Sequence, residues 1–108
     1  MNDENELSSY EFIHENQRGN FKIEITEIGV KPRSEYDDIR IEYSISVKNT
    51  DDPSWIITFR DARGIINTLD DRTRLLEKLK DEVLKFIDLD EGGEVYISEE
   101  VLDLTKDL

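Results

Sequence analysis

Two stretches in the first half of the chain alternate between apolar and polar residues. In FKIEITEI (21–28) the apolar positions begin at Phe21, and in DIRIEYSISVKNT (38–50) they run from Ile39 to Val47. Because successive side chains of a β-strand point to opposite faces, this period predicts two strands of a sheet that is covered on one face only. The second face carries charges of both signs and is expected to meet water.

A further strand is expected before these two. Tyr10 and Phe12 begin an apolar segment, and the turn-rich residues 14–20 can join it to the next strand as a hairpin. Residues 29–38 (GVKPRSEYDD) are polar and are interrupted by Pro32, so the sequence predicts a loop there.

The middle of the chain predicts one more strand and then becomes ambiguous. Residues 49–54 (NTDDPS) are typical of a turn, and residues 55–59 (WIITF) of a strand in which Trp55 is expected to anchor the core. Residues 60–69 (RDARGIINTL) fit either a returning hairpin strand or a short helix, and we favour helix or irregular structure.

Residues 69–87 predict the main helix. Thr68 and Asp71 have a spacing close to that of a capping box, in which an N-cap hydroxyl and an acid three residues on satisfy free backbone N–H groups. Apolar residues then recur at helical spacing, opposite a charged face: Leu75, Leu76, Leu79, Val83 and Phe86. Such a stripe usually packs on a sheet. The expected fold is therefore α+β, with an antiparallel sheet of about four to five strands and one main helix on its apolar face.

The length of the chain, 108 residues, predicts a single domain at 9–108 after a frayed acidic N-terminus at 1–8. The chain has no cysteine, which excludes disulfides and thiolate chemistry. The first residues carry neither a basic start nor an apolar run, so no signal peptide is expected. These features predict a cytoplasmic protein.

The charge of the chain is concentrated at its two ends. The formal net charge is −13. Residues 1–17 hold five acids and no Lys or Arg, residues 88–108 hold eight acids and one Lys, and the remainder is close to neutral. Direct binding of nucleic acid or of an anionic membrane is therefore not expected, whereas a basic protein surface is the natural complement. A homo-oligomer stays open.

Residues 88–99 (DLDEGGEVYISE) have the ligand spacing of a calcium loop, with Asp88 at position 1, Asp90 at 3, Gly93 at 6 and Glu99 at 12. The segment resembles the calcium loop of the EF-hand family. The resemblance implies bidentate coordination of calcium by Glu99, monodentate ligation by Asp88 and Asp90, and a backbone carbonyl ligand from Glu94.

The same residues also fit a β-hairpin. Apolar and polar residues alternate on both sides of Glu91-Gly92-Gly93, and glycine readily takes the positive φ that tight hairpin turns require. In a variant of this interpretation, the helix runs to about Asp88 and only residues 94–98 form a strand. We favour a strand or hairpin over the calcium loop.

No catalytic constellation stands out in the sequence. His14 is the only histidine, and no nucleophile lies at a readable spacing from it.

The C-terminal residues 98–108 fit a helix, an acidic tail that docks on a partner, or an element packed on the edge of the sheet.

These observations predict a non-enzymatic module, without a cofactor, that binds a basic protein surface as an inhibitor or antidote. Immunity proteins, antitoxins and phage anti-defence proteins share this size and acidity, and some of them mimic the charge of nucleic acid. The alternative is a calcium-binding module with ligands from Asp88, Asp90, Glu94 and Glu99. The residues expected to contact the partner are Asp88, Asp90, Glu91, Glu94, Glu99, Glu100 and Asp103.

Overall fold

The sheet expected from the alternating pattern has five strands, and the first four follow one another as antiparallel neighbours. The computed structural model describes residues 8–89 and 93–107. Residues 1–7, where the sequence predicts a frayed end, lie outside the described part. The regular elements are β1 (Ser9–Asn16), β2 (Gly19–Arg33), β3 (Asp38–Asn49), β4 (Asp52–Ile66), α1 (Arg72–Asp88) and β5 (Gly93–Tyr96), with 3-10 turns at Leu69–Asp71 and Leu104–Asp107.

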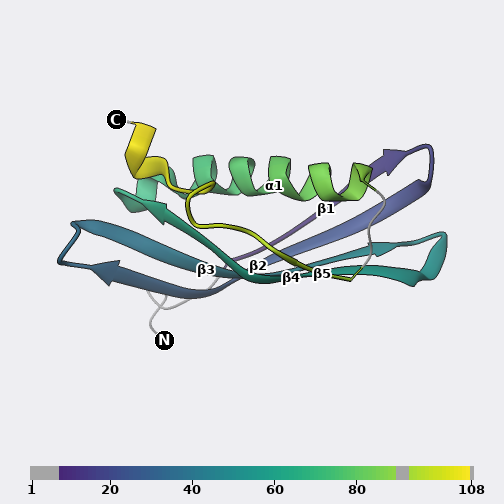
Figure 1. Cartoon of the computed structure of the whole chain (residues 1–108), viewed down its shortest axis with the longest axis horizontal. Coiled ribbons are helices and arrows are strands. Elements are labelled where there is room, and N and C mark those ends of the chain that lie inside the picture. The colour runs from purple at the N-terminus through teal and green to yellow at the C-terminus, as the bar shows by residue number, and fades with distance from the viewer. Residues whose placement is uncertain (1–7, 90–92, 108) are drawn as a thin grey trace.

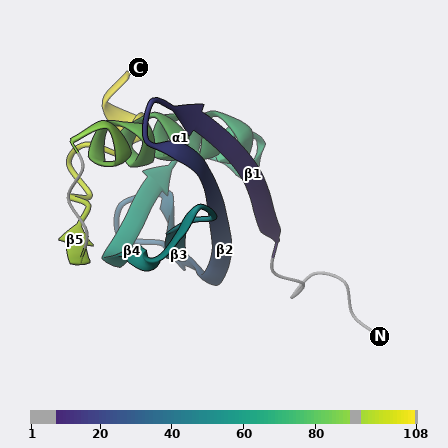
Figure 2. The same ribbon diagram turned by 90° about the vertical axis from the view of Figure 1, so that its right-hand side faces the viewer.

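The helix α1 lies across one face of the sheet, which confirms the α+β prediction (Figure 1). The sheet is strongly twisted, so that β1 and the first half of β2 rise beside α1 (Figure 2). Between sheet and helix lies the core, to which the apolar positions of the alternating strands contribute, together with Leu75, Leu79 and Val83 of α1. Trp55 is half-buried and packs edge-on against Phe21, with the ring centroids 5.0 Å apart.

Two strands are longer than predicted, because bulges carry them through segments that break the apolar alternation. The predicted loop at 29–38 is wrong for most of its length: after a bulge between Glu27 and Gly29, β2 pairs with β3 as far as Arg33. Pro32 is tolerated in β2 because β1 pairs with β2 only up to Thr26, so the strand has one free edge there.

The preference for helix or irregular structure at 60–69 is also wrong for residues 60–66. Asp61 takes a positive φ of 53° and produces a bulge, after which β4 continues to Ile66. This bulge shifts the alternation of the strand, so that Ala62 and Gly64 are buried beside Ile66.

The helix occupies the predicted residues, but its start is not a capping box. Thr68 is extended and its hydroxyl makes no capping hydrogen bond. Instead, the Asp71 backbone N–H donates to the Thr68 carbonyl at 3.0 Å, which closes the 3-10 turn that leads into α1.

The last strand corrects the expectation of an antiparallel sheet, since β5 runs parallel to β4. The helix ends at Asp88 and only a short strand follows, as the variant interpretation of 88–99 predicts; a full hairpin over these residues is wrong. After β5, the chain packs along the edge of the sheet: the Ile65 N–H donates to the Leu102 carbonyl, and Leu102 and Leu104 are buried. Among the three alternatives for the C-terminus, the packed terminal element is therefore the one observed.

Candidate functional site

Two of the glutamates predicted to contact a partner are ion-paired within the chain. Glu94 of β5 lies 3.1 Å from the Arg60 guanidinium on β4. Glu99 lies 3.4 Å from Arg40 and 3.2 Å from Arg63, so that it anchors the C-terminal segment to two neighbouring strands. These carboxylates stabilise the edge of the sheet, and little of their charge is free to attract a partner.

Two further acids at the C-terminus also have internal partners. Asp103 accepts hydrogen bonds from the backbone N–H and the hydroxyl of Thr105, which is a local turn motif. Glu100 lies 4.0 Å from Lys106, and both side chains are exposed. The C-terminal segment is thus acidic in sequence but largely self-paired in the fold.

The proposed calcium ligands that the structure describes do not converge. Asp88 is the last residue of α1, Glu94 points to Arg60, and Glu99 is held by arginines on β3 and β4. Asp90 and Glu91 lie outside the described residues. In residues 8–89 and 93–107, no group of three or more His, Asp or Glu side chains is arranged to hold a metal ion.

Asp88 instead belongs to an acidic surface at the end of the molecule where α1 finishes. The β1–β2 and β3–β4 turns lie at the same end, and Figure 2 views it directly. We call this surface the acidic end; it consists of Glu15, Asp51, Asp52 and Asp88, all of them exposed. The Arg18 side chain lies among them, and the His14 Nε2 is 3.7 Å from the Asp88 carboxylate.

Hydrogen bonds hold the acidic end in a defined shape. Arg18 in the β1–β2 turn donates to the carbonyls of Ile87 and Asp88 at 3.4 and 3.2 Å, and so satisfies carbonyls at the end of α1. The buried Asn49 accepts from the N–H groups of Asp51 and Asp52 at 2.8 and 3.1 Å. The two turns and the helix end therefore form one connected unit.

A second set of contacts ties the two turns to each other. The Asn49 side chain donates to the Arg18 carbonyl at 3.4 Å, and the Asn20 N–H donates to the Asp51 carboxylate at 3.0 Å. Gly19 is required between them, because its φ is +121° and a Cβ there would overlap the Asp51 carboxylate. Asp51 is consequently fixed in position before any partner arrives.

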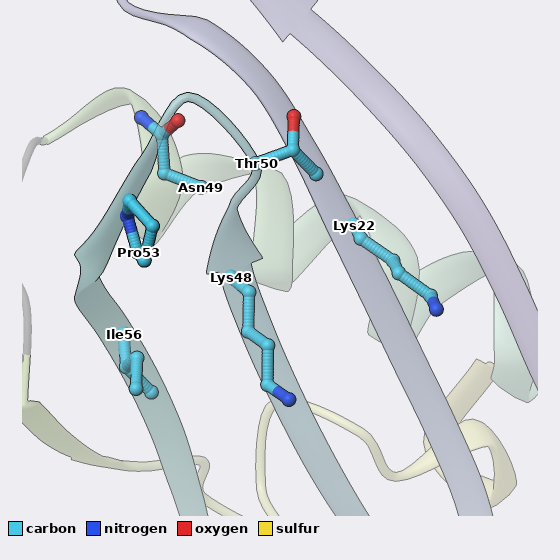
Figure 3. Close-up of a pocket in the computed structure, with 6 residues that line it drawn as sticks. All are labelled: Lys22, Lys48, Asn49, Thr50, Pro53 and Ile56. Carbon is cyan, nitrogen blue, oxygen red and sulfur yellow. The ribbon is translucent and has the colours of Figure 1, made fainter.

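The exposed face of the sheet has a different character. On this outer face, which points away from α1, Lys22 and Lys48 lie directly opposite each other on β2 and β3. They border a shallow pocket of about 460 Å³ with Pro53 and Ile56 (Figure 3). Lys22 also pairs with Glu11 at 3.2 Å, and hydrogen bonding to that carboxylate raises the pKa of Lys22. The pocket is thus locally basic and is a poor place for a basic partner to dock.

An ion pair that the sequence-based interpretation missed joins the sheet to the start of α1. Glu27 of β2 is 1% exposed, and its carboxylate accepts two hydrogen bonds from the guanidinium of Arg72, the first residue of α1. The signal was present in the sequence, because Glu27 continues the alternating series that places Phe21, Ile23 and Ile25 in the core. This pair joins the start of the helix to the sheet.

Tyr43 lies opposite Glu27 on β3 and is also buried. Burial, together with the negative charge of Glu27, raises the pKa of the Tyr43 hydroxyl above its ordinary value. His14, the single histidine, is half-buried in β1 with its Nε2 3.7 Å from the Asp88 carboxylate.

Comparison with known proteins gives no relative: no family model, no curated protein and no solved structure matches the chain. Among the described residues, no helix is both long and apolar enough to cross a membrane.

Proposed function

We propose that this protein is a non-enzymatic module that docks through its acidic end on a basic protein surface, as an inhibitor or antidote. The kinds of protein with comparable size and acidity are immunity proteins, antitoxins and phage anti-defence proteins. The observation that carries the proposal is the acidic end itself, where four exposed carboxylates from two turns and the end of α1 gather at one end of the fold.

The distribution of the basic side chains supports this proposal. All fourteen Lys and Arg residues lie in the described part of the chain. At least ten of them pair with carboxylates of the same chain. The surplus of negative charge therefore resides on carboxylates outside these pairs, and the acidic end gathers four of those.

Rigid carboxylates suit the recognition of arginine and lysine. Asp51 and Asp52 are held by backbone hydrogen bonds, so little conformational entropy is lost when a guanidinium binds them. Complementary charge also speeds the encounter between two proteins and makes it sensitive to salt. A tight, salt-dependent complex with a basic protein is expected.

The test compares two triple variants that remove the same charge from different ends of the molecule. Glu15→Gln, Asp51→Asn and Asp52→Asn neutralise three of the four carboxylates of the acidic end while retaining hydrogen-bond acceptors. Glu35→Gln, Asp37→Asn and Asp70→Asn remove three exposed acids elsewhere and serve as the matched control. Asparagine is well suited to position 37, where φ is +53°.

The wild-type protein is immobilised and exposed to host lysate at about 50 mM and about 500 mM NaCl, spanning the range in which screening removes most long-range attraction. A basic protein captured only at low salt is then purified and titrated with each variant. The acidic-end variant is expected to bind more than about tenfold more weakly, and the control within about twofold. Equal weakening by both variants, or capture of no basic protein at low salt, would contradict the proposal.

A further inference from the structure

The first strand of the sheet has an open edge. In the described structure β1 pairs only with β2, and the Glu27 N–H donates to the Ser8 carbonyl at 2.8 Å. In an antiparallel ladder, the residues whose backbone groups face the partner strand alternate with residues whose groups face away. Ser8 faces β2, so the backbone N–H and C=O groups of Ser9, Glu11, Ile13 and Glu15 point outward.

The side chains of these outward-facing residues lie together on the outer face of the sheet. Ile13 is 62% exposed, and Glu11 and Glu15 flank it at alternate positions. Natural proteins often protect such an edge with lysine or proline, but β1 (SYEFIHEN) contains neither. The edge therefore offers a row of free backbone groups marked by an acidic-apolar-acidic pattern.

We propose that β1 accepts an extended segment of the basic partner as an additional strand. This inference rests on the proposed function and names the part of the partner that is recognised. A Lys or Arg of the segment lies opposite Glu11 and another opposite Glu15, and an apolar residue lies opposite Ile13. Backbone hydrogen bonds supply affinity in this mode of binding, and the alternate side chains supply specificity.

Charge favours a basic segment over a second copy of this chain. If two copies of β1 paired about Ile13, Glu11 of one copy would face Glu15 of the other, and like charges directly opposite each other destabilise a strand pair. Lys22 already pairs with Glu11 at 3.2 Å, so a cation of the segment would share this carboxylate with Lys22, whereas Glu15 belongs to the acidic end.

The end of α1 contributes one acid at the end of this edge. Lys80 lies over the Phe12 ring at 5.0 Å, which places this part of the helix beside β1. At the last residue of the helix, the Asp88 carboxylate accepts a hydrogen bond from the Asn16 side chain of β1 at 3.3 Å.

The first test uses a synthetic peptide, Thr-Lys-Thr-Ile-Thr-Lys-Thr with blocked ends, and the same peptide N-methylated at both lysines and the isoleucine. The two have equal charge and nearly equal apolar surface, but the methylated peptide lacks the N–H groups that would face β1. The unmodified peptide is expected to bind at low salt, to protect the amides of Glu11, Ile13 and Glu15 from hydrogen exchange, and to bind more than about tenfold more tightly than the methylated one.

Binding of both peptides within about twofold would overturn strand addition, because charge alone would then explain the binding; the proposed function would stand in that case. Failure of the unmodified peptide to bind, or concentration-dependent dimerisation that protects the same three amides without peptide, would also overturn it.

A second test changes the protein. Ile13→Pro removes an outward N–H and no ladder hydrogen bond to β2, whereas Ile13→Thr keeps that N–H and serves as the matched control. The proline variant is expected to lose more than about tenfold in peptide affinity, and the threonine variant much less. Equal affinities of two folded variants would overturn the inference, and the peptide comparison does not depend on how well the proline variant folds.

Discussion

At the scale of single residues, the pair between Glu27 and Arg72 decides how the helix meets the sheet. A carboxylate that is 1% exposed is costly to bury unless it is hydrogen-bonded and neutralised, and the Arg72 guanidinium does both. The Ser8 backbone N–H also donates to this carboxylate, at 3.5 Å. Removing one partner of this pair should therefore destabilise the protein more than replacing both partners with apolar residues.

Replacing Arg72 with methionine tests this view. The variant leaves the Glu27 charge buried without its partner, and we expect the free energy of unfolding to fall by about 3 kcal/mol. Arg74→Met is the matched control, since Arg74 pairs with Asp71 at 3.4 Å on an exposed surface and should cost less than about 1 kcal/mol. Urea denaturation at pH 7 measures both; similar losses in the two variants would contradict a special role for Arg72.

Residue identity predicted part of this picture. The alternating series fixes which side chains of β2 face the core, and following it by two more positions reaches Glu27. The partner of Glu27 could not be predicted in the same way, because Arg72 is 45 residues away and is placed by the docking of the helix. Likewise, the charges of Glu94 and Glu99 were evident in the sequence, but their arginine partners were not.

At the scale of elements, the packing of α1 on β4 depends on a missing side chain. A Cβ at Gly64 would lie 2.7 Å from Leu75 Cδ2, much closer than a normal contact. Leu75 is fully buried at the start of the helix, so it has little room to move. The bulge at Asp61 is what brings this glycine to the inner face, opposite the helix.

Gly64→Ala is therefore expected to destabilise the protein by about 1–3 kcal/mol through overpacking, although alanine normally suits a strand better than glycine. Gly29→Ala is the control: its Cβ would meet the flexible end of Glu42 at 3.0 Å, and a loss below about 1 kcal/mol is expected. Thermal unfolding of both variants distinguishes the two outcomes. A stabilised Gly64→Ala protein would show that the helix can shift on the sheet.

The same bulge explains why some elements could be predicted from the sequence and others could not. Strands with unbroken alternation and the helix with its apolar stripe were predicted from local sequence alone. Residues 60–66 were not, because the positive φ at Asp61 changes which positions face the core. The parallel direction of β5 also could not be predicted, since four residues carry little pattern and the direction follows from the crossover by α1.

At the scale of the whole molecule, attraction within ion pairs acts over a few ångströms, whereas repulsion among the surplus carboxylates acts over tens of ångströms at low salt. The molecule measures 44 × 35 × 20 Å. At 10 mM salt the screening length is about 30 Å, so the surplus of negative charge repels itself across the whole molecule. At 150 mM salt this length is about 8 Å, so that only interactions between neighbouring charges remain strong. Most of these are attractive ion pairs.

We therefore expect the melting temperature to rise by several degrees when NaCl is increased from about 10 to about 150 mM. The triple variant Glu35→Gln, Asp37→Asn, Asp70→Asn has less self-repulsion and should show a smaller rise. Differential scanning calorimetry at pH 7 measures both proteins. A melting temperature that falls with added salt would mean that the local ion pairs outweigh the net charge of −13.

The order of the elements along the chain has a consequence for synthesis on the ribosome. β1 to β4 are joined by short hairpin turns and emerge first, so their contacts are local and can form early. Their apolar face stays bare until α1 emerges, and the edge of β4 stays open until β5 and Leu102 arrive. A chain that stops after Ile66 would thus expose the apolar face of its sheet to water, and quality-control proteases can recognise such a surface.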